Sequence, residues 1–152
     1  MSSDKDYQRA RSLALRYLSY RDRSEAETAE YLGKKGCEDT CRDRALAFLK
    51  EHNYLNDRRF AEHWARSRVQ NKQFGRYRVQ QELIGKGLAR DLVEETLDDV
   101  YGTVDERDLA RAVVDKKLPA LRDLDPAKRK RRLAGLLQRK GFSGDIIYQV
   151  LE

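Results

Sequence analysis

Two cysteines and two histidines are the side chains in this 152-residue sequence whose chemistry first suggests a site. Cys37 and Cys41 are four residues apart. Because His52 and His63 follow them, thiolate and imidazole groups could together bind zinc. The spacing fits no zinc finger, however, and an internal repeat of the sequence aligns both cysteines with large apolar residues. We therefore interpret both as reduced core side chains and predict that the protein binds no metal.

The sequence also lacks the motifs of a catalytic site. Residues 85–87 read Gly-Lys-Gly, but the strand and helix that flank a phosphate-binding glycine loop are missing, and the position is that of a helix end. No metalloprotease motif and no nucleophile elbow occurs. Eight carboxylates between residues 91 and 108 have the spacing of a helix surface, where they can pair with Lys and Arg. We predict that the protein is not an enzyme and uses no cofactor.

Charge is segregated along the chain, although the net charge is only +6. Residues 58–90 contain nine Lys and Arg and two Glu, a net charge of +7, whereas residues 91–108 contain one Arg and eight carboxylates, a net charge of −7. A further basic block occupies residues 128–132. Such segregation indicates an electrostatic partner, either nucleic acid or an acidic protein surface. The alternative is a set of solvated helix faces.

The basic stretch is where we expect binding. On a helical wheel, four long polar side chains form one stripe, which suits an elongated anionic surface: Arg59, Arg66, Gln70 and Gln73. Arg68 falls inside the apolar arc, so we expect it to reach outward or to pair with an acid. The predicted binding residues are Arg59, Arg66, Arg68, Lys72, Arg76, Arg78, Lys86 and Arg90, extended by Lys34, Lys35, Lys128, Arg129, Arg131 and Arg132.

Aromatic residues lie among these cations, and a ring can stack on a nucleobase. Trp64 lies opposite the stripe, within a run of apolar residues, so its position favours the core. Tyr77 falls on the flank of its helix away from the apolar residues and is the better candidate for a surface contact.

The elements that must position these side chains are helices arranged in repeats. A Leu followed closely by Lys-Gly occurs three times, with Gly36, Gly87 and Gly141 spaced 51 and 54 residues apart. Glycine supplies the left-handed residue past a helix end, and Lys offsets the negative end of the helix dipole. The residue after each glycine is apolar: Cys37, Leu88 and Phe142. A repeat of this length predicts a tandem array of helical units.

No segment shows sustained alternation of apolar and polar residues. We predict an all-α fold of about nine helices, an elongated tandem array of three three-helix repeats at residues 1–53, 54–103 and 104–152. Ser24 and Glu27 form a predicted capping box. The least regular segment, residues 118–124, is the expected hinge between the second and third repeats. The sequence has no apolar run for a membrane span. Two cysteines in a chain without an export signal indicate the reducing cytoplasm, and we expect a monomer.

Two stretches resemble the RecX family of bacterial recombination regulators. The family pattern is Gly-Tyr-Leu-Asp-Asp-x-x-Phe-Ala, then Gly-x-x-Arg-Ile-x-x-Glu-Leu-x-x-Lys-Gly-Ile. This sequence reads NYLNDRRFA at 53–61 and GRYRVQQELIGKGL at 75–88. Ser24, Glu27, Leu32 and Gly36 resemble the first family unit. The departures are modest: Asn replaces the first Gly of the turn at position 53, and Asn tolerates the same left-handed conformation.

The resemblance implies a protein that binds RecA, lodges in the groove of the RecA–single-stranded-DNA filament and inhibits the recombinase, ATPase and co-protease activities of RecA. Such a protein modulates DNA repair and the SOS response. The charge pattern by itself allows a second function, that of a stand-alone nucleic-acid-binding helical repeat. Both hold if weak nucleic-acid binding assists capture of the filament.

Overall fold

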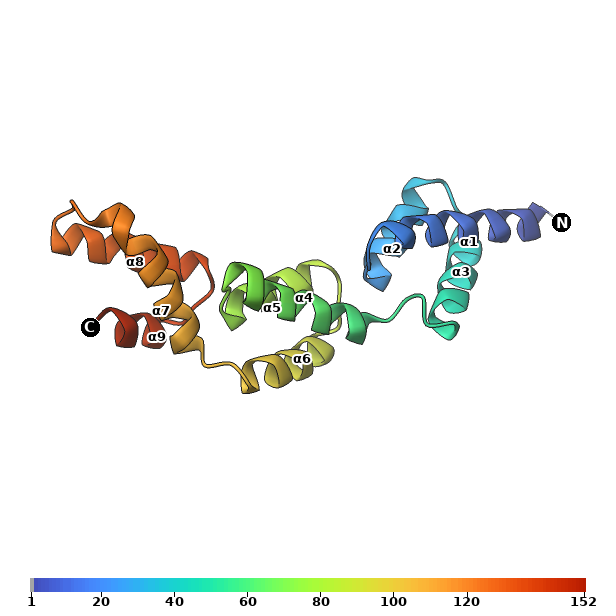
Figure 1. Cartoon of the computed structure of the whole chain (residues 1–152). Helices are drawn as coiled ribbons and strands as arrows, with labels where there is room; N and C mark the ends of the chain where they lie inside the picture. Colours follow the sequence, from blue (N-terminus) through green and yellow to red (C-terminus); the bar gives the residue numbers. More distant parts are fainter. Residues whose placement is uncertain (1) are drawn as a thin grey trace.

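The computed structural model describes residues 2–152, and over that range the chain forms nine α-helices, one short 3-10 helix and no strand. Figure 1 shows the helices following one another in an elongated array, with the two termini at opposite ends. The all-α prediction is confirmed. The elements are α1 (Ser2–Tyr20), α2 (Glu25–Lys34), α3 (Asp39–Glu51), α4 (Asp57–Lys72), α5 (Arg76–Gly85), α6 (Arg90–Gly102), α7 (Glu106–Lys117), η1 (Leu118–Leu121), α8 (Pro126–Arg139) and α9 (Gly144–Leu151).

Three separate apolar cores divide these helices into three domains. The first domain (α1–α3) buries Leu32 and Leu49, the second domain (α4–α6) buries Leu83 and Leu97, and the third domain (α7–α9) buries Leu137. The proposed boundaries, after residues 53 and 103, fall in the loops between α3 and α4 and between α6 and α7. Because each core is small, each domain depends on its neighbours as well as on its own packing.

The repeated Lys-Gly motif ends α2, α5 and α8. Gly36, Gly87 and Gly141 have φ values of 85°, 84° and 97°, which confirms the predicted left-handed conformation. In each domain the next residue donates its N–H to a carbonyl oxygen five residues earlier, as Leu88 does to Leu83 at 3.3 Å. This hydrogen bond closes the helix end and turns the apolar residue back onto the core.

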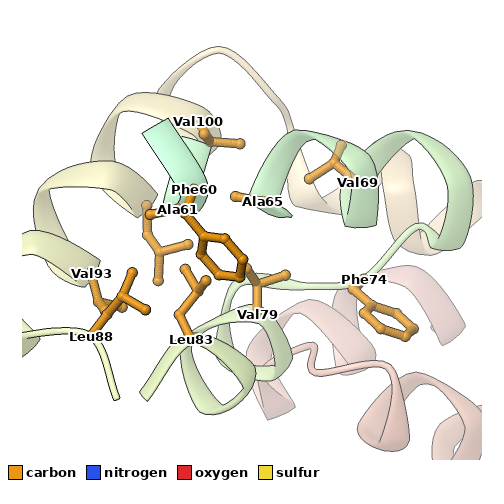
Figure 2. Close-up of a cluster of buried hydrophobic side chains, with 11 residues drawn as sticks. Phe60, Ala61, Ala65, Val69, Phe74, Val79, Leu83, Leu88, Val93 and Val100 are labelled. Atoms are coloured by element: carbon orange, nitrogen blue, oxygen red, sulfur yellow. The ribbon is translucent and has the colours of Figure 1, made fainter. Parts of the chain in front are cut away.

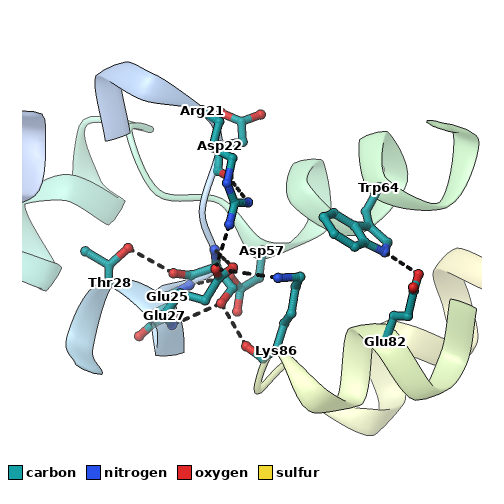
Figure 3. A network of polar contacts seen from close by, with 10 residues as sticks. Arg21, Asp22, Glu25, Glu27, Thr28, Asp57, Trp64, Glu82 and Lys86 are labelled. Carbon is teal, nitrogen blue, oxygen red and sulfur yellow. Dashed lines mark hydrogen bonds and ion pairs between the residues drawn. The ribbon is translucent and has the colours of Figure 1, made fainter. Parts of the chain in front are cut away.

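The second helices of the three domains meet end to end. At the first joint, the amino terminus of α2 contacts the carboxyl end of α5, where Ser24 Oγ donates a hydrogen bond of 2.8 Å to the Lys86 carbonyl oxygen. Beside it, the Glu25 N–H donates to Asp57 Oδ1 at 2.8 Å (Figure 3). The predicted capping box is confirmed, because Glu27 N–H donates to Ser24 Oγ and Glu27 Oε1 accepts from Ser24 N–H. One serine therefore both caps α2 and joins two domains.

The second joint repeats this arrangement, with the amino terminus of α5 against the carboxyl end of α8. The Gly75 N–H donates to the Lys140 carbonyl oxygen at 2.8 Å, and Arg78 Nη1 donates to the Arg139 carbonyl oxygen at 2.8 Å. A Cβ atom on Gly141 would lie 2.4 Å from Arg78 N. The glycine thus serves both the helix end and the close approach of two domains.

The prediction of a hinge at residues 118–124 is wrong, because this segment lies inside the third domain. Residues 118–121 form the 3-10 helix η1, and Leu121 is buried in the third-domain core beside Leu133 and Leu137. In the turn that follows η1, the Leu124 N–H donates to the Leu121 carbonyl oxygen at 3.1 Å, and the Leu124 side chain also packs against this core. An irregular composition therefore does not make this segment flexible.

The cysteines are part of the first-domain core, as predicted. Cys41 is buried, and Cys37 packs half-buried against the same apolar cluster. Within residues 2–152, no group of three or more His, Cys, Asp or Glu side chains is placed to hold a metal ion. None of the helices in that range is both long enough and apolar enough to cross a membrane.

Candidate functional site

Helix α4 has one face buried in the second-domain core and one face exposed to solvent. Phe60, Ala61 and Val69 of α4 pack against Val79 and other side chains of α5 and α6 (Figure 2). Arg66, on the predicted stripe, is exposed and contacts no carboxylate in the part of the chain that the structure describes. The stripe prediction therefore matches the structure at this residue.

Trp64 is half-buried, and its side chain contacts polar side chains of its own domain. Its indole N–H donates to Glu82 Oε1 at 2.9 Å (Figure 3). The guanidinium of Arg68 lies 4.3 Å and the Lys86 ammonium 4.6 Å from the ring centroid, and each favours the electron-rich face of the ring. Arg68 also pairs with Glu82 at 3.1 Å, as predicted for a cation within the apolar arc. Tyr77, by contrast, is 62% exposed.

Arg76 is held by the acidic face of α6. Its Nη2 lies 2.9 Å from Glu94 and 2.8 Å from Asp98. Burial alone lowers the pKa of Arg76, and the hydrogen bonds to the two carboxylates more than reverse that effect, so its pKa lies above the ordinary value. Arg58 similarly pairs with Glu95 at 3.0 Å. The segment of charge −7 thus faces and partly neutralises the segment of charge +7.

The remaining cations of the basic stretch fall into two groups. Arg78 pairs with Glu82 at 3.9 Å and covers the Phe74 ring, and Lys86 pairs with Glu27 of the first domain at 3.6 Å. Arg59 instead donates to backbone carbonyl oxygens of the preceding turn. Over residues 2–152, four cations of this stretch contact no carboxylate: Arg59, Arg66, Lys72 and Arg90.

The predicted extensions lie at opposite ends of the molecule, since α2 belongs to the first domain and α8 to the third (Figure 1). Lys34 pairs with Glu30 at 3.2 Å, and Lys35 lies over the Tyr31 ring. On α8, no carboxylate among the described residues pairs with the predicted cations. These cations are Lys128, Arg129, Arg131 and Arg132.

Arg131 and Arg132 line a groove between η1 and α8 together with cations that sequence reasoning did not select. The groove has a volume of about 500 Å³. Lys117, Arg139 and the neighbouring Lys140 sit at helix ends, where a cation is expected on account of the helix dipole alone. One signal in the sequence could have indicated this groove: Lys116 and Lys117 end α7, and the basic block at residues 128–132 lies in α8, the next α-helix.

Comparison with protein families gives three matches in order along the chain. Residues 10–49 match the first three-helix domain of RecX, residues 56–97 the second and residues 105–151 the third. A relative from Streptomyces coelicolor, named regulatory protein RecX, is 34% identical over 144 residues, which cover 95% of this chain and 76% of the relative. A relative of the same name from Chlorobium phaeobacteroides is 32% identical over 150 residues, covering 99% and 96%.

The chain belongs to the RecX family. Solved RecX structures have the same fold: the crystal structure of RecX from Lactobacillus salivarius superposes with a TM-score of 0.85 at 21% identity, covering 97% of this chain and 96% of that one. The match to the second RecX domain contains the whole basic stretch, residues 58–90, and the match to the third contains the groove beside α8. The family resemblance inferred from the sequence is therefore confirmed over all three domains.

Proposed function

We propose that this RecX-family protein binds RecA and its filament on single-stranded DNA and inhibits the recombinase, ATPase and co-protease activities of RecA. It thereby modulates DNA repair and the SOS response as a cytoplasmic monomer with no catalytic activity or cofactor of its own. The observation that carries the proposal is the ordered match of all three RecX domains, together with relatives named regulatory protein RecX.

The elongated shape of the molecule supports a mode of inhibition in which the protein occupies the surface of the RecA filament. Three small domains joined end to end present a long, thin body, which can lie along a helical filament and contact several subunits at once. Each contact can then be weak, because domains held in one chain bind with a high effective concentration. Exposed cations such as Arg66, Lys72 and Arg90 would steer the protein to an anionic surface and make association depend on salt.

The test compares RecA-coated with naked single-stranded DNA. We expect the protein to bind coated strands more tightly, and to slow ATP hydrolysis and strand exchange by RecA. Arg66→Glu in the second domain should weaken binding to coated strands, whereas Arg16→Glu, the same change at an exposed position of α1, should weaken it less. Unchanged ATP hydrolysis at saturating protein would contradict the proposal.

A further inference from the structure

Two adjoining hollows form a basic groove in the third domain. The first, between η1 and α8, has a volume of about 500 Å³, and the second, beside the joint with the second domain, has about 360 Å³. Both are lined by Lys117, Ala120 and Leu136. We call their union the third-domain groove. Its cations are Lys116, Lys117, Arg131, Arg132, Arg139 and Lys140.

These six cations have no carboxylate to neutralise them. No Asp or Glu lines either hollow, and within residues 2–152 none forms an ion pair with any of the six. Lys140 Nζ donates to the Lys72 carbonyl oxygen at 2.7 Å, so the row of cations reaches the end of α4. Burial, and then the charges of Lys116, Lys72 and Arg78, lower the pKa of Lys140. The cations repel one another, and an anion would relieve that repulsion.

The floor of the groove is apolar, and at Gly135 no side chain projects into the groove. Ala120, Leu121 and Leu136 line it, and Gly135 lies in the interior of α8 without a positive φ. Glycine is among the poorest residues for a helix interior, so its use there points to a need for space. The aligned positions of the first two domains, six residues before the repeat glycine, hold Glu30 and Gln81.

We propose that the third-domain groove binds the phosphodiester backbone of single-stranded nucleic acid. The cations of α7 and α8 can donate charge-assisted hydrogen bonds to phosphate oxygens, while the sugars lie on the apolar floor. A positively charged groove that follows the phosphate backbone is typical of proteins that bind single strands.

An acidic peptide fits the groove less well. A bound peptide needs partners for its own backbone N–H and C=O groups, and the floor, formed by Ala and Leu side chains beside Gly135, offers no such partners. A nucleic-acid strand has no such requirement and repeats its charge at every residue. This site goes beyond the function proposed above, because it binds a naked strand without RecA.

The test measures binding of a fluorescent oligothymidylate to the full-length protein without RecA, by anisotropy at several salt concentrations. The groove variant is Arg131→Gln with Arg132→Gln, and the matched control, on the same helix with the same charge change, is Lys128→Gln with Arg129→Gln. We expect the Kd to rise about tenfold or more at 0.1 M salt for the groove variant, with a log–log salt slope shallower by about 1.4. The control should change the Kd less than threefold.

A third variant tests the shape of the groove without changing its charge. Gly135→Leu favours the helix but fills the floor, so it should weaken binding several-fold while the circular-dichroism melt stays intact. Equal losses for the groove variant and its control, or no loss for the folded Gly135 variant, would overturn the proposal. Displacement of the strand by poly-glutamate at the same charge concentration would overturn it too, since the groove would then accept any acidic chain. Binding of naked strands with no effect on RecA would instead contradict only the function proposed above.

Discussion

The second and third domains are both rich in Lys and Arg, and they use these residues differently. In the second domain, five of nine cations pair with carboxylates, whereas in the third only three of twelve do, namely Arg107, Arg111 and Lys130. The acids of α6 and Glu82 neutralise the second domain from within. A charge run in a sequence therefore shows where charge is carried, and only the fold shows where it stays open to a partner.

The largest expected effect is on stability, at the joint between the second and third domains. Gly141→Ala places a side chain in a left-handed conformation and against the backbone of Arg78, which should cost about 2–4 kcal/mol of unfolding free energy. Gly36→Ala is the matched control, since Gly36 has a similar φ and no atom within 4 Å of its added Cβ. The control should cost only about 1–2 kcal/mol. Equal losses in urea unfolding would show that the joint contributes nothing to stability.

A second change makes the second domain resemble the third. Glu82→Gln removes the carboxylate that Arg68 and Arg78 share and that accepts from Trp64, so we expect a loss of about 2 kcal/mol. The same change leaves Arg68 and Arg78 without a carboxylate partner and should tighten binding of naked single strands. Glu62→Gln, in the same domain with no ion pair among the described residues, is the control for net charge. Equal gains in affinity for both variants would mean that net charge alone decides binding.

The third prediction compares one arginine of the second domain, Arg76, with one of the third, Arg132. Arg76→Gln removes ion pairs to Glu94 and Asp98 that are partly exposed, and should cost about 1 kcal/mol with little effect on strand binding. Arg132→Gln removes a cation with no carboxylate partner, so stability should change within about 0.5 kcal/mol while strand binding weakens. Thermal unfolding and anisotropy on the same preparations measure both quantities. The comparison fails if Arg132 matters for stability as much as Arg76.

Much of the fold could be predicted from the sequence because the features that determine it act between residues close together in the chain. The three glycines past helix ends, the Ser24 capping box and the apolar periodicity all act within one helix, and all are found in the structure. The hinge prediction for residues 118–124 is wrong because Leu121 lies in one core with Leu133 and Leu137, more than ten positions away. The same reason limited the candidate site. The partners of Arg58 and Arg76 on α6 come from a different helix, and helical periodicity does not reveal which helix faces which.

The smallest effect concerns the titration of Lys140 in the groove. Burial, and then the charges of Lys116, Lys72 and Arg78, lower its pKa, so near the lowered value the unfolded chain binds more protons than the folded one. Stability should therefore rise slightly as pH increases from the lowered pKa of Lys140 towards its ordinary value of 10.5. Lys116→Gln removes one of the repelling charges and should bring the pKa of Lys140 back towards 10.5, as measured by nitrogen-detected NMR of the lysine side chains. A bound strand should move the pKa in the same direction, because phosphate favours the charged ammonium. An unmoved Lys140 resonance on addition of strand would place the strand outside the groove.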